Sequence, residues 1–169
     1  MEKLVILKHC ELRPEVENDI VAIKQQHWNY PYDAQIEWMR NNLKKNDMHL
    51  LLYEDGQPVA YLNLVNVTVY VDGNQMPAVG IGNVCVTKCK IGYGIGRKIV
   101  QKANDIIKEL CMVGVLLCKE ELLDFYGKFG WHELTCGNIT IASNDYEKKI
   151  MFFNSTIIEV NGLSIDRNF

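Results

Sequence analysis

The spacing of hydrophobic and polar residues predicts a strand followed by two helices at the start of the chain. Residues 4–8 are mostly apolar, as expected of a strand. Pro14 suits the first turn of a helix because its fixed φ fits that position. Asp33 can cap a second helix with its side-chain oxygen. Each helix would bury one apolar stripe, which consists of Val16, Ile20 and Ile23 in the first helix and of Ile36, Met39 and Leu43 in the second.

The middle of the chain has the pattern of long strands joined by tight turns. An Asp-Gly pair at residues 55–56 lies between the apolar segments 48–53 and 58–71, and such a pair supplies the positive backbone angles of a hairpin turn. A second turn, Asp-Gly-Asn at residues 72–74, leads into a third strand at about residues 76–87. We therefore expect an antiparallel meander.

A strong helical pattern covers residues 95–110, where apolar residues recur at helical spacing against a polar face. Residues 112–118 are rich in Val and Leu and fit a buried parallel strand that follows this helical crossover. These segments together predict a strand–helix–strand motif.

The end of the chain completes the predicted fold class. A helix fits residues 120–129 with Gly130 as its C-cap, and strands fit residues 131–136 and 149–153. The order of elements predicts an α+β fold with a mixed, mostly antiparallel sheet of six to seven strands flanked by about four helices. We expect one domain over residues 1–169.

Composition and charge exclude several classes of partner. A net charge of -3 provides no basic surface of the kind that binds nucleic acid. No apolar run is long enough for a signal-peptide core or a membrane span, so we expect a cytoplasmic protein without a membrane partner. The six cysteines lack zinc-site spacing, so we expect no metal and interpret them as free thiols that act as small buried apolar residues.

Three glycines lie where the third long strand ends and the strongest helix begins. Gly92, Gly94 and Gly96 leave backbone amides bare at a helix N-terminus, where the dipole favours an anion. Glycine suits such a site because a phosphate must closely approach the main chain. The spacing lacks the Walker and dinucleotide-binding patterns, and a simple flexible turn is the alternative interpretation. Nearby positive charge comes from Lys88, Lys90 and Arg97.

This segment resembles the GNAT superfamily of acetyl-CoA-dependent N-acetyltransferases. In that family a strand ending in Val precedes Arg or Gln-x-x-Gly-x-Gly or Ala at a helix start; here Val86 ends the strand and Ile91 takes the first motif position. The resemblance implies a GNAT-like fold and acetyl-CoA as cofactor, with the pantetheine arm paired to the strand before the loop. The implied cofactor-binding residues are Val84, Cys85 and Val86 on the strand, and Ile91, Gly92, Tyr93, Gly94, Ile95, Gly96 and Arg97 on the loop.

A second resemblance lies in Phe125-Tyr126 followed by Gly130-Trp131, which is similar to the family's helix ending Phe-Tyr-x-x-x-Gly-Phe. Carried over from the family, Tyr126 would protonate the departing thiolate, because the pKa values of phenol and thiol are roughly matched. The alternative is that Tyr126 only packs beside its aromatic neighbours.

Within the superfamily, the chain most resembles the aminoglycoside N-acetyltransferases that modify the amine on the second carbon of the amino sugar. The acidic residue that helps deprotonate the amine there corresponds to Gly82 and Asn83 here. The candidate bases are therefore Asp33, Glu37 and the terminal carboxylate of Phe169. The substrate-binding positions that we expect are Asp33, Glu37, Gly82, Asn83 and Lys119.

Several alternatives stay open at this stage. The acceptor is a small-molecule amine, either an aminoglycoside or another amine such as a polyamine, an amino acid or a peptide terminus, and a non-catalytic acyl-CoA-binding sensor is the rival from another class. A homodimer is an open alternative to a monomer. We assign no role to His49 or His132, which we interpret as core residues. Four further carboxylates could contribute on the substrate side, although such residues are more often solvated surface charges: Asp72, Glu120, Asp145 and Asp166. Four aromatic residues would either line a sugar pocket or belong to the core: Trp28, Tyr30, Tyr32 and Trp38.

Overall fold

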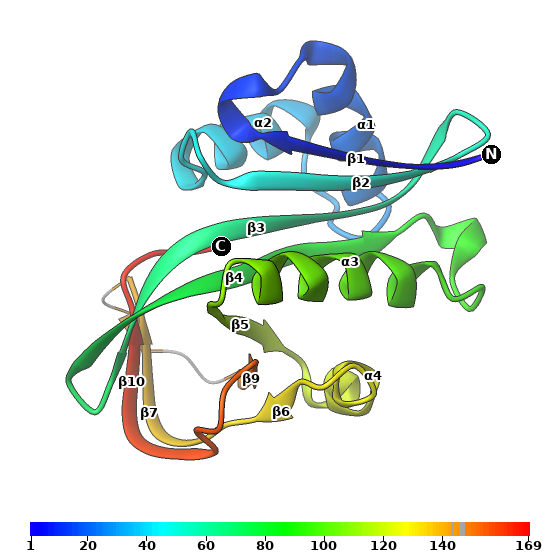
Figure 1. Cartoon of the computed structure of the whole chain (residues 1–169). Coiled ribbons are helices and arrows are strands. Elements are labelled where there is room, and N and C mark those ends of the chain that lie inside the picture. Colours follow the sequence, from blue (N-terminus) through cyan, green and yellow to red (C-terminus); the bar gives the residue numbers. More distant parts are fainter. Residues whose placement is uncertain (143, 146–147) are drawn as a thin grey trace. The chain divides into compact units, whose positions relative to one another are not determined.

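The computed structural model describes residues 1–142, 144–145 and 148–169, without the side chain of Asp145 (Figure 1). The described residues form two compact units. The first unit consists of Met1–Val65, Gly82–Ala103 and Phe169, and the second of Asn66–Ile81 and Asn104–Asn168. Three long elements contribute residues to both units, namely β3 (Gln57–Val71), β4 (Asn74–Val86) and α3 (Ile95–Glu109).

In the first unit, β1 (Glu2–Lys8) pairs antiparallel with β2 (Met48–Glu54), and β2 pairs antiparallel with the first part of β3. Helices α1 (Pro14–Lys24) and α2 (Tyr32–Asn42) lie side by side, as Figure 1 shows. Both predicted stripes are buried, and burying such a side chain contributes roughly 1.5–3 kcal/mol. The two predicted helices are therefore confirmed.

The start of α2 differs from the prediction. Pro31 occupies the N-cap position with an extended ψ of 154°, and Asp33 lies in the first turn instead. No side chain caps this helix start among the described residues. The prediction that Asp33 is the cap is wrong, because the backbone turns into the helix two residues earlier. Its carboxylate still lies where the helix dipole favours a negative charge.

The two Asp-Gly turns have the predicted backbone. Asp55 and Gly56 have φ values of 50° and 80°, and Asp72 and Gly73 have values of 47° and 84°. These left-handed angles match the right-handed twist of the paired strands. Both hairpins are confirmed.

In the second unit, β5 (Val113–Cys118) pairs parallel with β4 from Ala78 and Val113 to Ile81 and Leu116. On its other side β5 pairs antiparallel with β9 (Lys149–Phe153), which also pairs with β6 (His132–Glu133). This is the buried parallel strand that the Val- and Leu-rich segment predicts.

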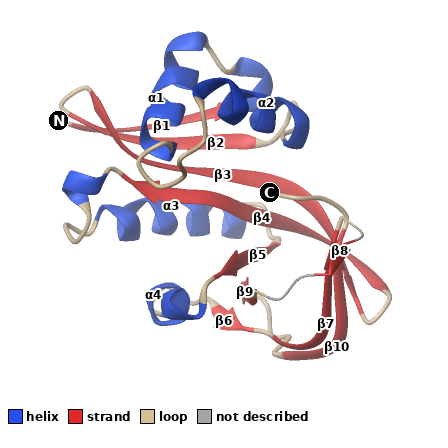
Figure 2. Cartoon of the chain, turned by 180° about the vertical axis from the view of Figure 1, so that it is seen from behind, coloured by secondary structure: helices blue, strands red, loops and turns tan. Residues whose placement is uncertain are grey.

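A further group of strands in the second unit has parallel and antiparallel neighbours. Strand β10 (Glu159–Ile165) pairs antiparallel with the end of β3 and parallel with β7 (Thr135–Ile141), and β7 and β10 lie next to each other in Figure 2. Strand β8 (Asn144–Asp145) pairs antiparallel with the end of β7. The sheet is mixed and mostly antiparallel, which confirms the predicted fold class.

The last third of the chain departs from the prediction in detail. The described residues form ten strands rather than six or seven, because the predicted strand 131–136 divides into β6 and β7 and because β8 and β10 are additional. Helix α4 (Leu123–Gly127) is shorter than the predicted helix 120–129, and a 3₁₀ turn at Glu120–Leu122 precedes it. The predicted C-cap is wrong as well: Lys128 is the C-cap, and Gly130, with φ at 87°, lies in the turn beyond it.

No helix in the described part of the chain is long and apolar enough to cross a membrane.

Candidate active site

The loop between β4 and α3 is shaped by two glycines. Gly92 and Gly94 have φ values of 89° and 79°, a region that side chains with a Cβ rarely adopt. A Cβ at either position would meet no atom within 4 Å, so the backbone angle alone requires glycine here. Gly96 lies in the first turn of α3 without a positive φ. Two of the three predicted glycines therefore set the conformation of the loop.

The loop leaves several backbone N–H groups open. The amides of Ile91 and Tyr93 donate to the carbonyls of Lys88 and Lys90 at 3.4 and 3.3 Å. Among the described residues, the amides of Gly92 and Gly94 have no partner within the protein. The first turn of α3 adds further amides that no preceding helical carbonyl can accept from. These amides and the positive end of the helix dipole have the chemistry that suits an anion.

The side chains around the loop are exposed. Ile91 and Tyr93 are 58% and 75% exposed. Lys90 forms an ion pair of 2.8 Å with Glu54, and this hydrogen bond raises the pKa of Lys90. Part of the positive charge predicted around the loop is therefore neutralised by Glu54. The backbone supplies the polar groups of the loop, and Ile91 adds none.

Strand β4 changes its backbone just before the loop. Asn83 has φ at 54°, which is uncommon for a residue other than glycine and marks an irregularity within the strand. Its Nδ2 donates to Oδ1 of Asn63 on β3 at 2.7 Å. Beyond this point Val84 and Val86 are half-buried and Cys85 is buried. The predicted cofactor strand thus begins at a backbone irregularity.

Three sequence-predicted candidates come together at Gly82. A Cβ at Gly82 would lie 2.6 Å from the main-chain carbonyl carbon of Phe169 and 3.2 Å from the side-chain amide of Asn63. Only glycine fits there, which explains why no acidic side chain stands at this position. Asn63 is fully buried, and within the described residues its Nδ2 has no hydrogen-bond partner. Phe169, Gly82 and Asn83 therefore share one polar cluster with Asn63, a residue that the sequence reasoning missed.

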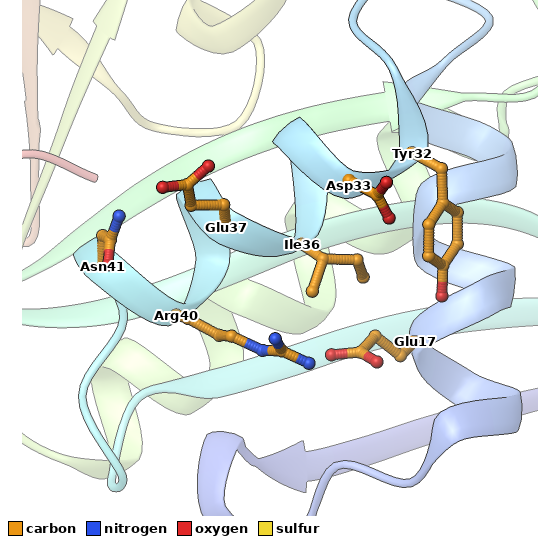
Figure 3. A pocket seen from close by; sticks show the side chains of 7 residues that line it. All are labelled: Glu17, Tyr32, Asp33, Ile36, Glu37, Arg40 and Asn41. Atoms are coloured by element: carbon orange, nitrogen blue, oxygen red, sulfur yellow. The ribbon is translucent and has the colours of Figure 1, made fainter.

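The other two candidate bases line a pocket of about 430 Å³ on helices α1 and α2 (Figure 3). Figure 3 shows the guanidinium of Arg40 pointing toward the carboxylate of Glu17. With three carboxylates and one guanidinium, the lining favours a cationic group. The lining residues are Glu17, Tyr32, Asp33, Ile36, Glu37, Arg40 and Asn41.

Tyr126 is a buried residue of α4 in the second unit. Its ring contacts Phe125 edge to face with centroids 5.0 Å apart, and Trp131 with centroids 6.4 Å apart. Burial raises the pKa of Tyr126 well above its ordinary value, and the neighbouring Cys118 adds to this. The phenol therefore keeps its proton, and its pKa is less closely matched to a thiol than the sequence predicts.

The turn after α4 is anchored by a polar residue of α3. Nδ2 of Asn104 donates to the carbonyl of Phe129 at 3.0 Å, and Oδ1 accepts from the indole N–H of Trp131 at 2.9 Å. Sequence reasoning missed this role because a polar residue within an amphipathic helix is ordinary. Lys119, a predicted substrate-binding residue of this unit, is exposed and lies 3.8 Å from Glu121.

Two of the additional carboxylates have structural partners. Oδ1 of Asp72 accepts from the amides of Asn161 and Gly162 at 2.9 and 2.8 Å. Oδ1 of Asp166 accepts from the amide of Thr68 at 2.9 Å. Both carboxylates therefore stabilise local backbone. Glu120 is exposed, and the side chain of Asp145 lies outside the described residues.

The aromatic residues near α1 and α2 differ in their surroundings. Tyr32 lines the pocket and donates its hydroxyl to Oδ1 of Asn18 at 2.7 Å, whereas Tyr30 is exposed. The ammonium of Lys24 lies 4.6 Å from the ring centre of Trp38, and Trp28 is half-buried. Only Tyr32 of this group contributes to the pocket.

Three polar side chains in the first unit are linked in a row, half-buried His9 and the buried residues His49 and Tyr61. Nδ1 of His9 lies 3.0 Å from Nε2 of His49, whose Nδ1 lies 2.9 Å from the hydroxyl of Tyr61. Burial lowers the pKa of His49 to about 3, so this ring stays neutral. Burial also lowers the pKa of Lys24 to about 8. His49 is the hydrogen-bonded core histidine that the sequence indicates. His132 is half-buried, and its Nε2 lies 2.8 Å from the carbonyl of Ile157.

The cysteines are free thiols, but the prediction that they are buried is wrong for most of them. Only Cys85 and Cys118 are buried, because only these two face the interior from a strand. The exposed cysteines are Cys10, Cys89 and Cys111, and Cys136 is half-buried. In the part of the chain that the structure describes, no cluster of His, Cys, Asp and Glu could hold a metal ion.

Solved structures share this architecture. An acyl-CoA N-acyltransferase from Pseudomonas aeruginosa matches with a TM-score of 0.68 and 19% identity, over 90% of this chain and 99% of that one. ElaA from Escherichia coli matches with a TM-score of 0.67 and 20% identity, over 90% and 99%. A GNAT family acetyltransferase from Brucella melitensis, crystallised in complex with acetyl-CoA, matches with a TM-score of 0.57 and 22% identity, over 77% and 83%. The fold is therefore the α+β GNAT fold.

The family model of the acetyltransferase (GNAT) domain matches residues 11–134. The chain belongs to this family and is an enzyme of the GNAT N-acetyltransferase class. No curated protein matches the sequence significantly.

Proposed function

We propose that this enzyme transfers the acetyl group of acetyl-CoA to a primary amine of a small molecule. The observation that carries the proposal is the loop at residues 91–96, where open amides of Gly92 and Gly94 precede the N-terminus of α3. An acyl-CoA contains a diphosphate, which is the anion that such a loop binds. The amides of Ile95 and Gly96 in the first turn of α3 take part as well, and Ile91, Tyr93 and Arg97 are the remaining proposed residues of this site.

The rest of the cofactor follows strand β4 in this proposal. The pantetheine arm pairs with the backbone of Val84, Cys85 and Val86. The left-handed φ of 54° at Asn83 supports this, because it changes the direction of the strand just before these residues. The apolar side chain of Ile91 adds no polar contact, so the affinity rests on backbone groups and on the charges of Lys88 and Arg97.

The reaction we propose is direct attack. The neutral amine forms a C–N bond with the acetyl carbon, the C–S bond breaks, the amine proton passes to a base and the thiolate of CoA accepts a proton. Tyr126 is the proposed proton donor to this thiolate. The phenol carries the proton that the role needs at neutral pH, as any tyrosine does, and burial raises its pKa, which makes it a weaker acid than an ordinary tyrosine.

Three residues stay candidates for the base. Phe169 is favoured by its position, because its main-chain carbonyl carbon lies 2.6 Å from where a Cβ of Gly82 would stand. Asp33 and Glu37 line the pocket on α1 and α2, where they also suit a role in binding the amine. In that pocket the negative charge favours a cationic acceptor.

The finer proposal is that the acceptor is an aminoglycoside, modified on the amine of the second carbon of the amino sugar, with Lys119, Gly82 and Asn83 near the sugar. Polyamines, amino acids and peptide termini are the competing acceptors. The cytoplasmic location, the single domain and the homodimer remain predictions that the fold does not test.

Thiol release from acetyl-CoA, measured with tobramycin, spermidine, lysine amide and a short peptide, tests the proposal. Turnover with at least one amine is expected, and turnover with tobramycin, whose amino sugar carries an amine on its second carbon, would support the finer proposal. If only the other amines react, the aminoglycoside is the wrong acceptor. If the chain neither binds acetyl-CoA nor releases thiol with any amine, the proposed function is wrong.

A further inference from the structure

The turn after helix α1 is bonded to the segment that leads into the cofactor loop. Oε1 of Gln26 accepts from the amide of Lys88 at 2.8 Å and from the hydroxyl of Thr87 at 2.9 Å. Nε2 of Gln26 donates to the carbonyl of Ala22 at 3.2 Å. Both polar atoms of this amide are therefore engaged, which fixes the side chain between α1 and the loop segment.

The next residue reinforces this connection. Nε2 of His27 lies 2.6 Å from the carbonyl oxygen of Val86. A carbonyl can only accept, so Nε2 carries the proton in this contact. Two consecutive residues of the α1 turn thus hold three consecutive residues at the end of β4, namely Val86, Thr87 and Lys88.

The bonds of Gln26 continue into the loop itself. Lys88 begins a 3₁₀ turn, and its carbonyl accepts from the amide of Ile91. The carbonyl of Lys90, at the end of the same turn, accepts from the amide of Tyr93. The residues that Gln26 holds therefore carry the backbone on which the open amides of Gly92 and Gly94 are arranged.

We propose that Gln26 is a positioning residue for the cofactor loop. This inference rests on the proposed function, since it takes residues 91–96 to bind the diphosphate of acetyl-CoA. Gln26 acts through Thr87 and Lys88 and holds the loop in its binding conformation before the cofactor arrives. A site that is already ordered binds more tightly, because the apparent affinity falls with the fraction of molecules in the competent conformation.

Replacing Gln26 by Met tests this, because Met has a similar length and cannot accept the two hydrogen bonds. Calorimetric titration with acetyl-CoA is expected to show a dissociation constant about tenfold higher than that of the wild type, as would follow if about one molecule in ten then held the loop ready. S-acetylpantetheine, which lacks the diphosphate and the nucleotide, should bind both proteins with affinities within about twofold of each other.

Gln25→Met is the matched control. Gln25 is the neighbouring glutamine, and in the part of the chain that the structure describes its side chain donates only to the carbonyl of Tyr30, at 3.2 Å. The Gln25→Met variant should bind acetyl-CoA with the affinity of the wild type. The inference is overturned if Gln26→Met binds acetyl-CoA like the wild type, if the control loses as much affinity, or if S-acetylpantetheine binding falls as much as acetyl-CoA binding. The last result would indicate a general structural defect.

A measurement on the wild type keeps the inference testable if Gln26→Met does not fold. Amide hydrogen exchange at Lys88 is expected to be slow without cofactor, because this amide donates to Gln26. Exchange at the rate of an unfolded chain without cofactor would overturn the inference. Absence of acetyl-CoA binding by the wild type would instead remove the proposed function, and this inference with it.

Discussion

The cofactor loop and the acidic pocket belong to the same compact unit, yet they are built in different ways. The loop is made of main chain: its shape comes from positive φ at Gly92 and Gly94, and its binding groups are amides. The pocket is made of side chains from two helices, with three carboxylates and one guanidinium. The binding groups of the loop are therefore set by the local backbone conformation, whereas those of the pocket are set by which side chains the two helices bring together.

This difference explains how much each region says about function. A backbone site binds one kind of group, a small anion such as a phosphate, on any chain that adopts the same turn. A side-chain pocket selects its ligand by charge and shape, and a small number of substitutions changes both. The cofactor class follows from the first region, and the acceptor has to be found by experiment.

The largest effect is expected at the proton donor that we assign to the cofactor sulfur. Tyr126→Phe removes only the hydroxyl, so turnover should fall by about 100-fold, as is typical of losing a general acid. The dissociation constant of acetyl-CoA should stay unchanged. Steady-state kinetics and calorimetry measure the two effects. Phe125→Leu, a change in the ring that packs on Tyr126, is the control. Unchanged turnover in Tyr126→Phe would remove Tyr126 from the mechanism.

The comparison is sharpened by two glycines with the same backbone. Gly94 in the loop and Gly56 in a hairpin have φ values of 79° and 80°, and neither has an atom within 4 Å of a Cβ position. Replacing either by Ala should lower the free energy of unfolding by about 1–2 kcal/mol. Only Gly94→Ala should also weaken acetyl-CoA binding, by about tenfold or more, because loop strain shifts the amides. Equal affinities of the two variants would contradict the assignment of the loop.

The acidic pocket should respond in the opposite way. The double variant Asp33→Asn with Glu37→Gln removes two negative charges, so the KM of a cationic amine should rise by about five- to tenfold. Acetyl-CoA affinity should not change. Glu15→Gln, an exposed change on α1 outside the lining, is the control. If the wild type, the double variant and Glu15→Gln have equal KM values, the pocket does not bind the acceptor.

The smallest effect on function is expected from His49, which belongs to neither region. Its pKa in the folded protein is about 3, below the ordinary value of 6.5, so its contribution to stability is present above pH 6.5 and is lost as the pH falls toward 3. His49→Gln keeps a polar side chain without this titration. Urea unfolding between pH 7 and 4 should therefore show a shallower loss of stability in the variant. Parallel curves for the two proteins would contradict a buried neutral His49.

Elements with a strong local signal could be predicted from the sequence. The Asp-Gly turns at residues 55–56 and 72–73 require positive φ, and the amphipathic pattern of α3 repeats over four turns. Strand β10 could not be predicted, because Asn161-Gly162 within it is itself a turn signal. Helix α4 is short because contacts around Trp131 fix the following turn, and those contacts join residues far apart in sequence.

The candidate site likewise has a part that could be predicted from the sequence and a part that could not. The loop residues are consecutive, so one motif indicates them all. The cluster of Asn63, Gly82 and Phe169 joins three distant segments, and the sequence contains no spacing that links them. The contacts of Gln26 and His27 could not be predicted from the sequence either, since a polar residue after a helix is ordinary. A search for polar residues in apolar strands would have found Asn63.

The most direct test follows the backbone amides themselves. Adding CoA to the ¹⁵N-labelled wild-type protein should shift the amide resonances of Gly92, Gly94 and Gly96 more than those of Gly56 and Gly73, because the diphosphate bonds to the loop and not to the hairpins. The account would be contradicted if the loop resonances do not shift at a saturating concentration of CoA, or if CoA does not bind at all.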